Sequence, residues 1–588
     1  MIHKNFKWLR VASIGFLVFI VFGAYFKIFS AEFVYDDYAF IVNNKAIHGL
    51  SPVSKFFTDP NIFTGAQDNL GGKNWRPISS LAFALQYKVF GANPAGFHFI
   101  GILFHLINAL LVYFLAKKLL NRTDGALAIA SLWALHPVLT EAVSWISNQS
   151  SLIFFGFFLT AILALFKERF WASYLFFAFS LLSKETALGG LVVIAAIFFI
   201  NKINWKKFIP FVLIGLAYFW LRFEILESLG DHVLRGSFWQ NLLLAPAVFW
   251  KYIALSVWPA NLLLDYSNFP LPSGIFDIRV ILGVLSLISC GLLIWLSIKK
   301  SWPYFGLGIV WFIAFLLPVM QIIPFQDIVG ERFLYAPLAG FFLAAVWGFE
   351  KLPEHFVGAG TKILIVILFI FFGLTMRRNN DWMNSENLWQ SVLRVDSRNE
   401  KAAQNLSAFY LQKGDGEKIV EFSKKLLEIN PNSKAGRLHL AVGKIMKGEY
   451  KEAEAELLML IKKYPDFQEA RNNLLVLYQQ TGQDGFILGT ATAPAVEGNI
   501  VNSGIAGKVV IGSDKPFEAS LAVYKSDNPN TPFISVRAHS DGTFQIPLRQ
   551  GFYILKPLDP DGPAAPVKES YSFIIGNGQW LQVKIEYK

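Results

Sequence analysis

Long apolar runs recur along the first part of this chain and stop at Met376. A helix needs about 20 mostly apolar residues to cross the hydrocarbon core of a bilayer, and runs of roughly that length follow one another from Trp8 onward. The chain has 588 residues, of which 54% are hydrophobic and only 16% are charged, less charge than soluble domains carry. The sequence therefore predicts a polytopic α-helical membrane protein with a soluble C-terminal part.

The positions of the apolar runs predict about eleven transmembrane helices. We expect them near 8–28, 95–116, 126–145, 148–166, 170–184, 186–201, 207–222, 278–298, 303–323, 332–350 and 360–377. The first segment follows Lys4, Lys7 and Arg10, as in a signal peptide, but it is too long for an h-region and no convincing small-residue cleavage site follows it. We therefore interpret it as the first spanning helix.

One further apolar segment, 242–264, is ambiguous because it contains Pro246, Lys251, Pro259 and Asn261. If it spans, the soluble part lies in the cytoplasm. Lys and Arg accumulate in the cytoplasmic loops of membrane proteins. With the N-terminus inside and this segment not crossing, every inner loop carries Lys or Arg. We therefore expect 242–264 to lie along the outer surface or to re-enter it, and the soluble part to lie outside the cytoplasm.

The net charge of +11 fits the same pattern of basic inner loops. No basic cluster falls in the soluble part, so we expect no nucleic-acid partner. The single cysteine, Cys290, excludes an intrachain disulfide and is interpreted as a packing residue. No spacing of His, Cys and carboxylate residues matches a dedicated metal site.

The predicted topology gathers acids and bases on the outer face. Asp36 and Asp37 follow directly on the first helix, at the start of a large outer loop, 29–94. The same loop holds His48, Asp59 and Arg76, and other outer loops add Glu141, Trp145, Asn148, Gln149, Lys184, Glu185, Arg222, Arg235, Gln321, Asp327, Glu331 and Arg332. Charge close to a membrane is costly and tends to mark function. For any single residue the alternative is a headgroup contact or a snorkelling side chain.

The soluble part begins with an amphipathic stretch, Trp382 to Gln390, and then shows a period of 34 residues. Positions that recur at this spacing are Leu406, Leu440 and Leu474; Gly414, Gly448 and Gly482; and Pro431 and Pro465. A 34-residue helix-turn-helix period is the tetratricopeptide signature. We expect an amphipathic lead-in and repeats over 379–482. Such arrays bind peptides or proteins, so a protein partner is one reading and a spacer role is the other.

Residues 483–505 are rich in Gly, Ala and Thr and are interpreted as a linker. From about 506 to 588 the apolar period becomes two, in seven short segments separated by turn residues such as Asp541-Gly542. This spacing predicts a β-sandwich. The run Ser540-Asp541-Gly542-Thr543-Phe544 with Gly551-Phe552-Tyr553 resembles carboxypeptidase-regulatory-like, transthyretin-like domains. We expect a binding or spacing role there, because no catalytic constellation is present.

Ordered motifs of the membrane part, 1–378, resemble a known family. They are Phe33-x-Tyr35-Asp36-Asp37 with Ile41, Asn44 and Ile47; Asn74-Trp75-Arg76-Pro77; Phe90-Gly91-x-Asn93-Pro94; Leu135-His136-Pro137-x-x-Thr140-Glu141-Ala142-Val143-x-Trp145; Ser183-Lys184-Glu185; Pro259-x-Asn261-Leu262-x-x-Asp265-Tyr266; and Glu331-Arg332-Phe333-Leu334-Tyr335-x-Pro337. Together they resemble the TMTC-type glycosyltransferases, relatives of the protein O-mannosyltransferases in the GT-C superfamily. The resemblance covers about 1–480.

The resemblance implies an inverting transfer of sugar from a polyprenyl-phosphate donor to a hydroxyl, on a protein or a glycan, at the extracytoplasmic face. A carboxylate near the membrane surface can take the proton of the acceptor hydroxyl, and fixed cations can stabilise the phosphate that leaves. By analogy we assign Asp36 as the base and Asp37 as its partner, with a divalent cation (Mg or Mn) between them and the donor as an option. For the donor phosphate we select Lys184 and Arg332, then Arg222 and Arg76. Supporting roles fall to Glu141, Glu185, Glu331 and His136, whereas His98 and His105 are interpreted as packing residues.

Three departures from the family concern the acceptor. Ser147-Asn148-Gln149 stands where the family often has a basic residue after the Trp-Ile pair, the repeat array is short, and the β-domain is an addition. Two other functions stay open: a non-enzymatic membrane scaffold that presents the repeats and the β-domain to an envelope partner, and a lipid-linked oligosaccharide ligase. The expected location is the bacterial inner membrane with the C-terminal part in the periplasm, or the endoplasmic-reticulum membrane and lumen in a eukaryote.

Overall fold

The computed structural model describes residues 2–50, 52–65, 74–226, 237–322, 327–351, 353–464, 467–481, 503–525, 528–549, 551–558, 564–576 and 579–588. The chain divides into two compact units, Met1–Ala402 and Ala403–Lys588. Several positions named above lie outside the described residues: Arg235, Pro465, Gly482 and most of the predicted linker 483–505.

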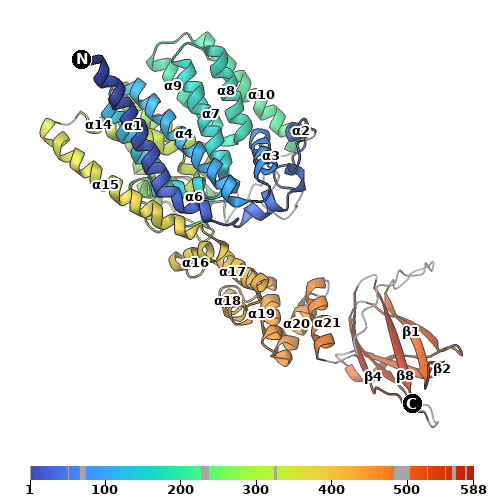
Figure 1. Ribbon diagram of the computed structural model, residues 1–588. Helices are drawn as coiled ribbons and strands as arrows, with labels where there is room; N and C mark the ends of the chain where they lie inside the picture. The colour runs from blue at the N-terminus through green and yellow to red at the C-terminus, as the bar shows by residue number, and fades with distance from the viewer. Residues whose placement is uncertain are drawn as a thin grey trace. The chain divides into compact units, whose positions relative to one another are not determined.

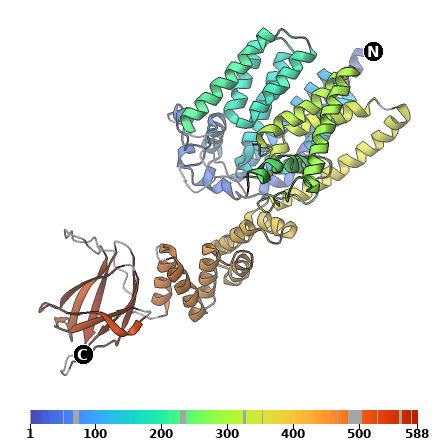
Figure 2. The ribbon, with the colours of Figure 1, turned by 180° about the vertical axis from the view of Figure 1, so that it is seen from behind.

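The first unit is a bundle of α-helices (Figures 1 and 2). Its helices are α1 (Ile2–Tyr25), α2 (Lys55–Thr58), α3 (Pro77–Phe90), α4 (Pro94–Leu120), α5 (Thr123–Ala134), α6 (Thr140–Ser144), α7 (Gln149–Leu165), α8 (Phe170–Ser183), α9 (Gly190–Ile200), α10 (Ile209–Leu226), α11 (Phe238–Val257), α12 (Ile278–Lys299), α13 (Pro303–Leu316), α14 (Pro337–Phe349), α15 (Glu354–Asp381) and α16 (Ser385–Val395). Short 3-10 turns extend several of them, including η6 (Glu185–Gly189) and η9 (Glu331–Leu334). The helical class predicted from the apolar runs is confirmed.

Local sequence fixes many of these helix ends. Proline at the first helical position suits a backbone N–H that has no partner there, and Pro77, Pro94, Pro303 and Pro337 begin α3, α4, α13 and α14. Gly91 ends α3 with a φ of 59°, and Asn121 ends α4 in the left-handed conformation. Between α5 and α6 the chain bends by 52° at His136-Pro137.

The described part of the chain contains six helices long and apolar enough to cross a membrane, or seven if the bent pair α5–α6 counts as one span. Four shorter apolar helices accompany them: Phe170–Ser183, Glu185–Ile200, Pro303–Val319 and Pro337–Phe349. Each of the predicted segments coincides with one of these helices. The protein is therefore an integral membrane protein, and the count of about eleven spans remains a prediction.

Helix α11 occupies the ambiguous segment 242–264 and is not among the candidate spans found in the described residues. Its first part follows the end of α10, and its last turn lies beside the bend at His136, because Ser256 O accepts from His136 Nε2 at 3.2 Å. Near its middle, Pro246 lies so close to Gly283 of α12 that a Cβ at Gly283 would lie 1.9 Å from the Pro246 carbonyl oxygen. The placement of 242–264 along or into the outer surface stays a prediction.

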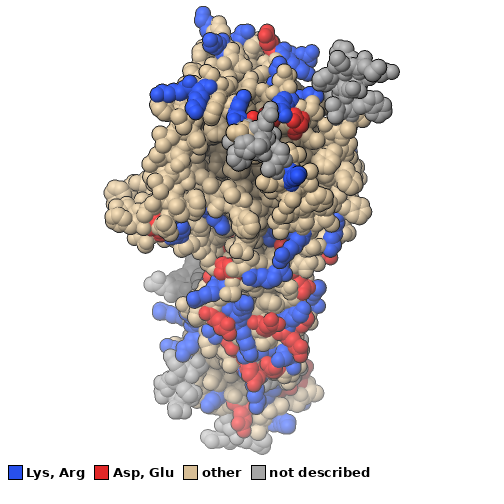
Figure 3. Space-filling model, turned by 90° about the vertical axis from the view of Figure 1, so that its left-hand side faces the viewer, with Lys and Arg blue, Asp and Glu red and all other residues tan. Residues whose placement is uncertain are grey.

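The ends of the bundle differ in charge. The N-terminus and the α9–α10 connection lie at the end away from α6 (Figure 1). The connections rich in Lys and Arg include 117–122, 202–207 and 299–300. Figure 3 shows a broad band over the first unit with few charged side chains, bordered at one end by Lys and Arg. This band matches the apolar belt that a bilayer requires.

Two buried indoles fix the segment before α14, which carries Glu331 and Arg332. Trp133 Nε1 donates to Tyr335 O at 2.9 Å, and Trp311 Nε1 donates to Ala336 O at 2.9 Å. Both indoles are fully enclosed in the main hydrophobic core of the bundle. The turn η9 is thereby held against α5 and α13.

The second unit begins with helices that recur in pairs. They are α17 (Glu400–Lys413, which starts in the first unit), α18 (Gly416–Ile429), α19 (Lys434–Met446), α20 (Tyr450–Lys463) and α21 (Gln468–Gln480). The starts of α17, α19 and α21 are 34 residues apart, as are those of α18 and α20. Gly414 and Gly448 have φ of +74° and +77°, so the recurring glycines mark the left-handed turn inside each pair. Paired helices are present at the predicted period, and their assignment to the tetratricopeptide class remains a prediction.

The C-terminal region is a β structure. Its strands are β1 (Gly504–Ile511), β2 (Lys515–Pro516), β3 (Ser520–Lys525), β4 (Asn528–Arg537), β5 (Thr543–Pro547), β6 (Gly551–Pro557), β7 (Tyr571–Ile575) and β8 (Trp580–Tyr587). One sheet has the order β2-β1-β5 with β8 parallel to β1, and the other has the order β4-β3-β6-β7. Residues of both sheets enclose one hydrophobic cluster that includes Ile505, Val523 and Ile585. The predicted strands are all present, and the transthyretin-like assignment remains a prediction.

Candidate functional site

The adjacent carboxylates Asp36 and Asp37 have different surroundings. Asp37 is fully buried; its Oδ1 accepts from Ser147 N at 2.8 Å and from Ser147 Oγ, and its Oδ2 accepts from Val34 N at 3.1 Å. Burial raises the pKa of Asp37 to about 7, although these hydrogen bonds act in the opposite direction. Asp37 thus ties the loop after α1 to the α6–α7 connection, and each of its oxygens already accepts a hydrogen bond.

Asp36 is only partly buried, and within the described part of the chain its carboxylate makes no hydrogen bond or ion pair. Desolvation raises the pKa of Asp36 to about 6; Lys401 and Arg332 lower it, and Asp327 raises it. Tyr35 just before it has a φ of 51°, a left-handed conformation that costs a tyrosine about 1–2 kcal/mol. This turn lets the two carboxylates point to different partners and leaves Asp36 free to accept a proton.

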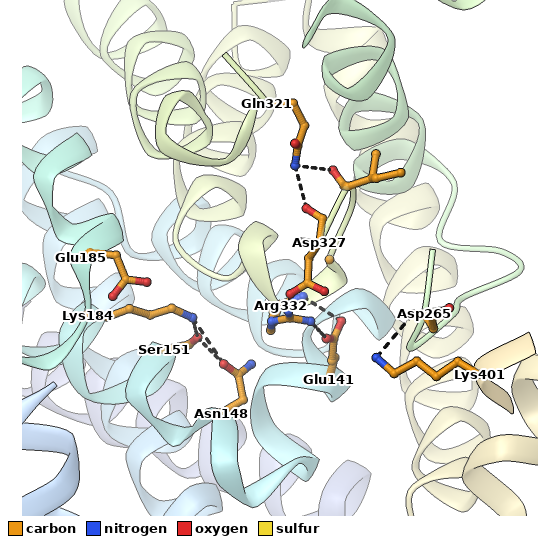
Figure 4. A network of polar contacts seen from close by, with 12 residues as sticks. Glu141, Asn148, Ser151, Lys184, Glu185, Asp265, Gln321, Asp327, Arg332 and Lys401 are labelled. Carbon is orange, nitrogen blue, oxygen red and sulfur yellow. Dashed lines mark hydrogen bonds and ion pairs between the residues drawn. The ribbon is translucent and has the colours of Figure 1, made fainter. Parts of the chain in front are cut away.

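Arg332 lies between two carboxylates (Figure 4). Its backbone N–H donates to Glu141 Oε2 at 3.0 Å, its guanidinium donates to Glu141 Oε1, and the other side of the guanidinium contacts Asp327. The rings of Trp145 and Phe333 lie 5.4 and 4.7 Å from the guanidinium carbon. Arg332 is thereby fixed in orientation, and much of its charge is balanced by Glu141 and Asp327.

Glu331, one residue earlier, turns away from Arg332 toward α15. Its Oε1 accepts from Tyr266 Oη at 2.9 Å and from Leu263 N, while its Oε2 lies 3.6 Å from Arg378 Nη2. Glu331 is fully buried and Arg378 is 6% exposed. Glu331 thus anchors the loop after α11 and links it to the last turns of α15.

Lys184 is the predicted phosphate ligand that has no carboxylate contact in the described structure. Its Nζ donates to Ser151 Oγ at 2.6 Å and to Asn148 Oδ1 at 3.3 Å, as Figure 4 shows. It is 3% exposed and lies 5.7 Å from the centre of the Phe333 ring. Burial lowers the pKa of Lys184 well below its usual range; Arg76 and Arg332 act in the same direction, and Glu185 and Glu141 act against it. An anion bound beside Nζ would favour the protonated, positively charged form.

Arg76 and Arg222, by contrast, are both engaged by Glu185. Arg76 Nε and Nη2 donate to the two Glu185 oxygens at 3.0 and 2.7 Å, and Arg222 Nη1 lies 3.9 Å from Glu185 Oε2. Arg222 Nη1 also donates to Trp75 O at 3.4 Å. This triad joins the outer loop, α10 and the α8–α9 turn, and its three charges sum to one positive charge beside Lys184.

His136 lies at the bend between α5 and α6, away from the carboxylates. Its ring packs against Phe342 and Phe371 and its Nε2 contacts Ser256 O. His105 is buried between Tyr335 Oη and Ala134 O, at 2.9 and 3.1 Å, as expected for a packing residue. The position of His136 suits a role in holding the bend.

The predicted metal option does not fit the geometry of Asp36 and Asp37. Both oxygens of Asp37 are occupied by donors from Ser147 and Val34, so the pair does not converge on one ion. Among the residues that the structure describes, no group of three His, Cys, Asp or Glu side chains is placed to hold a metal.

Sequence reasoning missed two cations of this region. Lys401 lies in the first turn of α17, where its Nζ is 3.6 Å from Asp265 Oδ1 and 4.9 Å from the centre of the Tyr35 ring. Arg378 lies in the last turns of α15, and from the sequence it was identified only as the last residue of the membrane part, 1–378. Neither residue stands in a recognisable motif, and only folding brings each of them to the outer face.

A long apolar groove of about 1100 Å³ runs along α15. Its walls come from α5, α14, α15 and the loop after α11, and include Leu132, Phe342, Ile367, Phe371 and Leu262. The lining stretch from Gly360 to Arg378 is about 27 Å long at 1.5 Å per helical residue, close to the thickness of a bilayer core. Arg122, Asp124 and Glu350 lie at one end, and Arg377, Arg378, Asp381 and Arg394 at the other.

No protein-family model matches this chain. A protein O-mannosyl-transferase of Caenorhabditis elegans is 29% identical over 403 residues, covering 65% of this chain and 57% of that protein. Human protein O-mannosyl-transferases TMTC3 and TMTC4 are 22% and 26% identical, covering 76% and 69% of this chain and 54% and 64% of their own lengths. The chain thus spans between half and two thirds of these curated relatives. The predicted resemblance to the TMTC-type proteins is confirmed.

Among solved structures, ArnT from Cupriavidus metallidurans in the apo state is 11% identical, with a TM-score of 0.35 over 79% of this chain and 82% of that one. A likeness of this size does not establish a shared fold.

Proposed function

We propose that this chain is an inverting GT-C-type glycosyltransferase that moves a sugar from a polyprenyl-phosphate donor to a hydroxyl, on a protein Ser or Thr, at the extracytoplasmic face. The observation that carries the proposal is the unengaged Asp36 carboxylate, which faces Lys401 and Arg332 at the end of the first membrane helix. The similarity to relatives named protein O-mannosyl-transferases supports the reaction class and the protein acceptor.

The reaction requires a base on the acceptor side. Asp36 takes the proton of the acceptor hydroxyl while that oxygen attacks the anomeric carbon of the donor sugar. The bond between the anomeric carbon and the phosphate oxygen breaks, and the polyprenyl phosphate leaves with the electron pair. One displacement inverts the anomeric centre. A carboxylate whose pKa is near 6 is ionised at neutral pH and is basic enough to accept the proton.

The leaving phosphate requires fixed positive charge. Lys184 supplies it most directly, because its Nζ contacts the neutral oxygens of Ser151 and Asn148 and an arriving phosphate would favour its protonated form over the neutral form that burial favours. Arg332 contributes less net charge, since Glu141 and Asp327 already contact it. Arg76 and Arg222 act through Glu185, where they maintain the positive field beside Lys184.

The apolar groove gives the donor a place for its chain. A polyprenyl tail is long and apolar, and the groove runs about the thickness of the bilayer core along α15. Its outer end lies at Arg378, which contacts Glu331 beside Arg332. A lipid in this groove would therefore place its phosphate beside Arg378, whose partner Glu331 directly precedes Arg332.

The test compares two classes of variant in purified protein. Asp36→Asn keeps the size of the side chain and removes its basicity, so transfer should fall by at least about 100-fold while polyprenyl-phosphate binding is retained. Lys184→Gln should weaken binding of the lipid phosphate, because one charge-assisted hydrogen bond contributes about 1.5–3 kcal/mol. Lys118→Gln, an exposed lysine of the 117–122 connection that is outside the groove lining, is the matched control and should leave both measurements unchanged. Unchanged transfer in both site variants would favour the scaffold and contradict the proposed enzyme.

A further inference from the structure

Lys401 connects the C-terminal helical region to the proposed base. It lies in the first turn of α17, yet its ammonium is 4.9 Å from the centre of the Tyr35 ring and 3.6 Å from Asp265 Oδ1. Tyr35 is the residue immediately before Asp36. Nothing in the sequence pattern around Lys401 distinguishes it from the other lysines of the helical repeats.

The backbone that carries Lys401 is docked firmly onto the loop after α11. Asn399 Nδ2 donates to Asp265 Oδ2 at 2.9 Å, and Asn268 Nδ2 donates to Asp396 Oδ2 at 2.7 Å and to Arg398 O at 3.0 Å. These side-chain contacts bind the two segments to each other from both sides. These contacts fix the backbone that carries Lys401. The position of its ammonium is therefore set by the docked segment and not by the side chain alone.

The charged groups around Asp36 come from several elements. Lys401 from α17 and Arg332 from η9 favour its ionised form, whereas Asp327, from the loop before η9, opposes it. Tyr35 and Asp37 flank it in its own segment and are coupled to it electrostatically. Arg332 is in direct contact with Glu141 and Asp327, so its influence is reduced. Lys401 is the cation with the larger effect on Asp36.

We propose that Lys401 is a positioning residue of the transfer site, which brings a positive charge to the turn Tyr35-Asp36 and makes the docked segment 396–401 a part of that site. This inference rests on the proposed function, because it assigns Lys401 a task only if Asp36 accepts a proton. It means that the membrane part alone does not complete the site. It also assigns the docked segment 396–401 a second task besides connecting the two parts.

The test is the pH profile of transfer by the full-length protein. Removing a neighbouring opposite charge raises the pKa of a carboxyl by roughly 1–3 units. In Lys401→Gln the acid limb of kcat/KM should therefore move to higher pH by that amount. For a shift of one unit, transfer at pH 6 falls roughly fivefold relative to wild type, and at pH 9 the two proteins agree. Lys401→Arg keeps the charge and should restore the wild-type limb.

Two further variants, Lys413→Gln and Asp36→Asn, distinguish a failure of this inference from a failure of the proposed function. Lys413→Gln, in the last turn of the same helix, removes a lysine that lies over Phe409 and should leave the profile unchanged. A loss in Lys401→Gln that is equal at every pH would mean a structural role and overturn the inference, as would an unshifted acid limb. If Asp36→Asn still abolishes transfer in that case, the proposed function stands without Lys401. If Asp36→Asn also transfers normally, the proposed function itself fails.

Discussion

The contrast between Asp36 and Asp37 is set by the donors around each carboxylate. Asp37 accepts three hydrogen bonds from Ser147 and Val34 and is sealed from solvent, whereas Asp36 has none of these contacts. The left-handed turn at Tyr35 separates them, and its ring is held between Trp145 and Trp389 at 5.8 and 5.2 Å. We therefore expect Asp36 to accept the proton in the reaction and Asp37 to hold the loop in place.

Replacement by alanine should separate these roles by stability. Asp37→Ala leaves two buried N–H groups and a hydroxyl without their acceptor, and an unsatisfied buried group costs about 1–3 kcal/mol. We expect a clearly lower melting temperature for Asp37→Ala in detergent, and an unchanged one for Asp36→Ala. Equal melting temperatures for wild type and Asp37→Ala would contradict the anchoring role.

The acid limb of the wild-type reaction should reflect Asp36. Burial raises the pKa of Asp36 to about 6, so the base is protonated and inactive below that pH and ionised above it. Transfer should therefore fall about tenfold per pH unit below 6 and level off above 7. Binding of polyprenyl phosphate, measured over the same range, serves as the control, because loss of donor at low pH would produce a similar limb. A rate independent of pH from 5 to 8 would exclude Asp36 as the base.

At the scale of elements, α15 serves both the bundle and the outer face. Its last turns are joined to α1 and α6, since Asn379 Nδ2 donates to Ala24 O at 2.9 Å and Asn379 Oδ1 accepts from Ser144 Oγ at 2.7 Å. One face of α15 lines the apolar groove, and the opposite face is exposed, as membrane-facing helices are. The groove therefore has a fixed outer end and walls formed by helices distant in sequence.

Filling the groove should weaken donor binding. Ile367 lines the groove, and Ile367→Trp adds volume that must displace a bound chain or its neighbours, a cost of about 1–3 kcal/mol. We expect the dissociation constant for polyprenyl phosphate to rise by roughly 5- to 150-fold. The matched control is Phe369→Trp on the same helix, where the side chain is 75% exposed. If both variants bind the lipid equally well, the chain does not occupy this groove.

At the scale of the whole molecule, the charge pattern supports the proposed topology. The basic connections lie at one end of the first unit, and the proposed site lies at the other, where α1, α6 and α15 meet. Helix α11 is excluded from the candidate spans by its composition. This arrangement supports the proposal that the site and the C-terminal units face the outside.

A fused reporter tests this topology directly. An enzyme active only outside the cytoplasm, joined after Lys588, should be active, and one active only in the cytoplasm should be silent. The same two reporters joined after Lys300, in an inner loop, should give the opposite pattern and serve as the control. Cytoplasmic activity at Lys588 would mean that 242–264 crosses the membrane.

Patterns in the sequence were sufficient to predict the helices and strands of this protein. Runs of apolar residues define the bundle, the 34-residue period defines the paired helices, and the period of two defines the strands, because each pattern reflects the geometry of a single element. Ordered motifs also singled out Asp36, Lys184 and Arg332. Which of these charged side chains are already paired with an opposite charge follows from the tertiary structure. Arg76 and Arg222 were selected as phosphate ligands from their charge, yet Glu185 engages both, while Lys401 entered the site without any motif. Whether a charged side chain can contact a substrate depends on the partners that it meets from distant segments. A local sequence pattern contains no information about those partners.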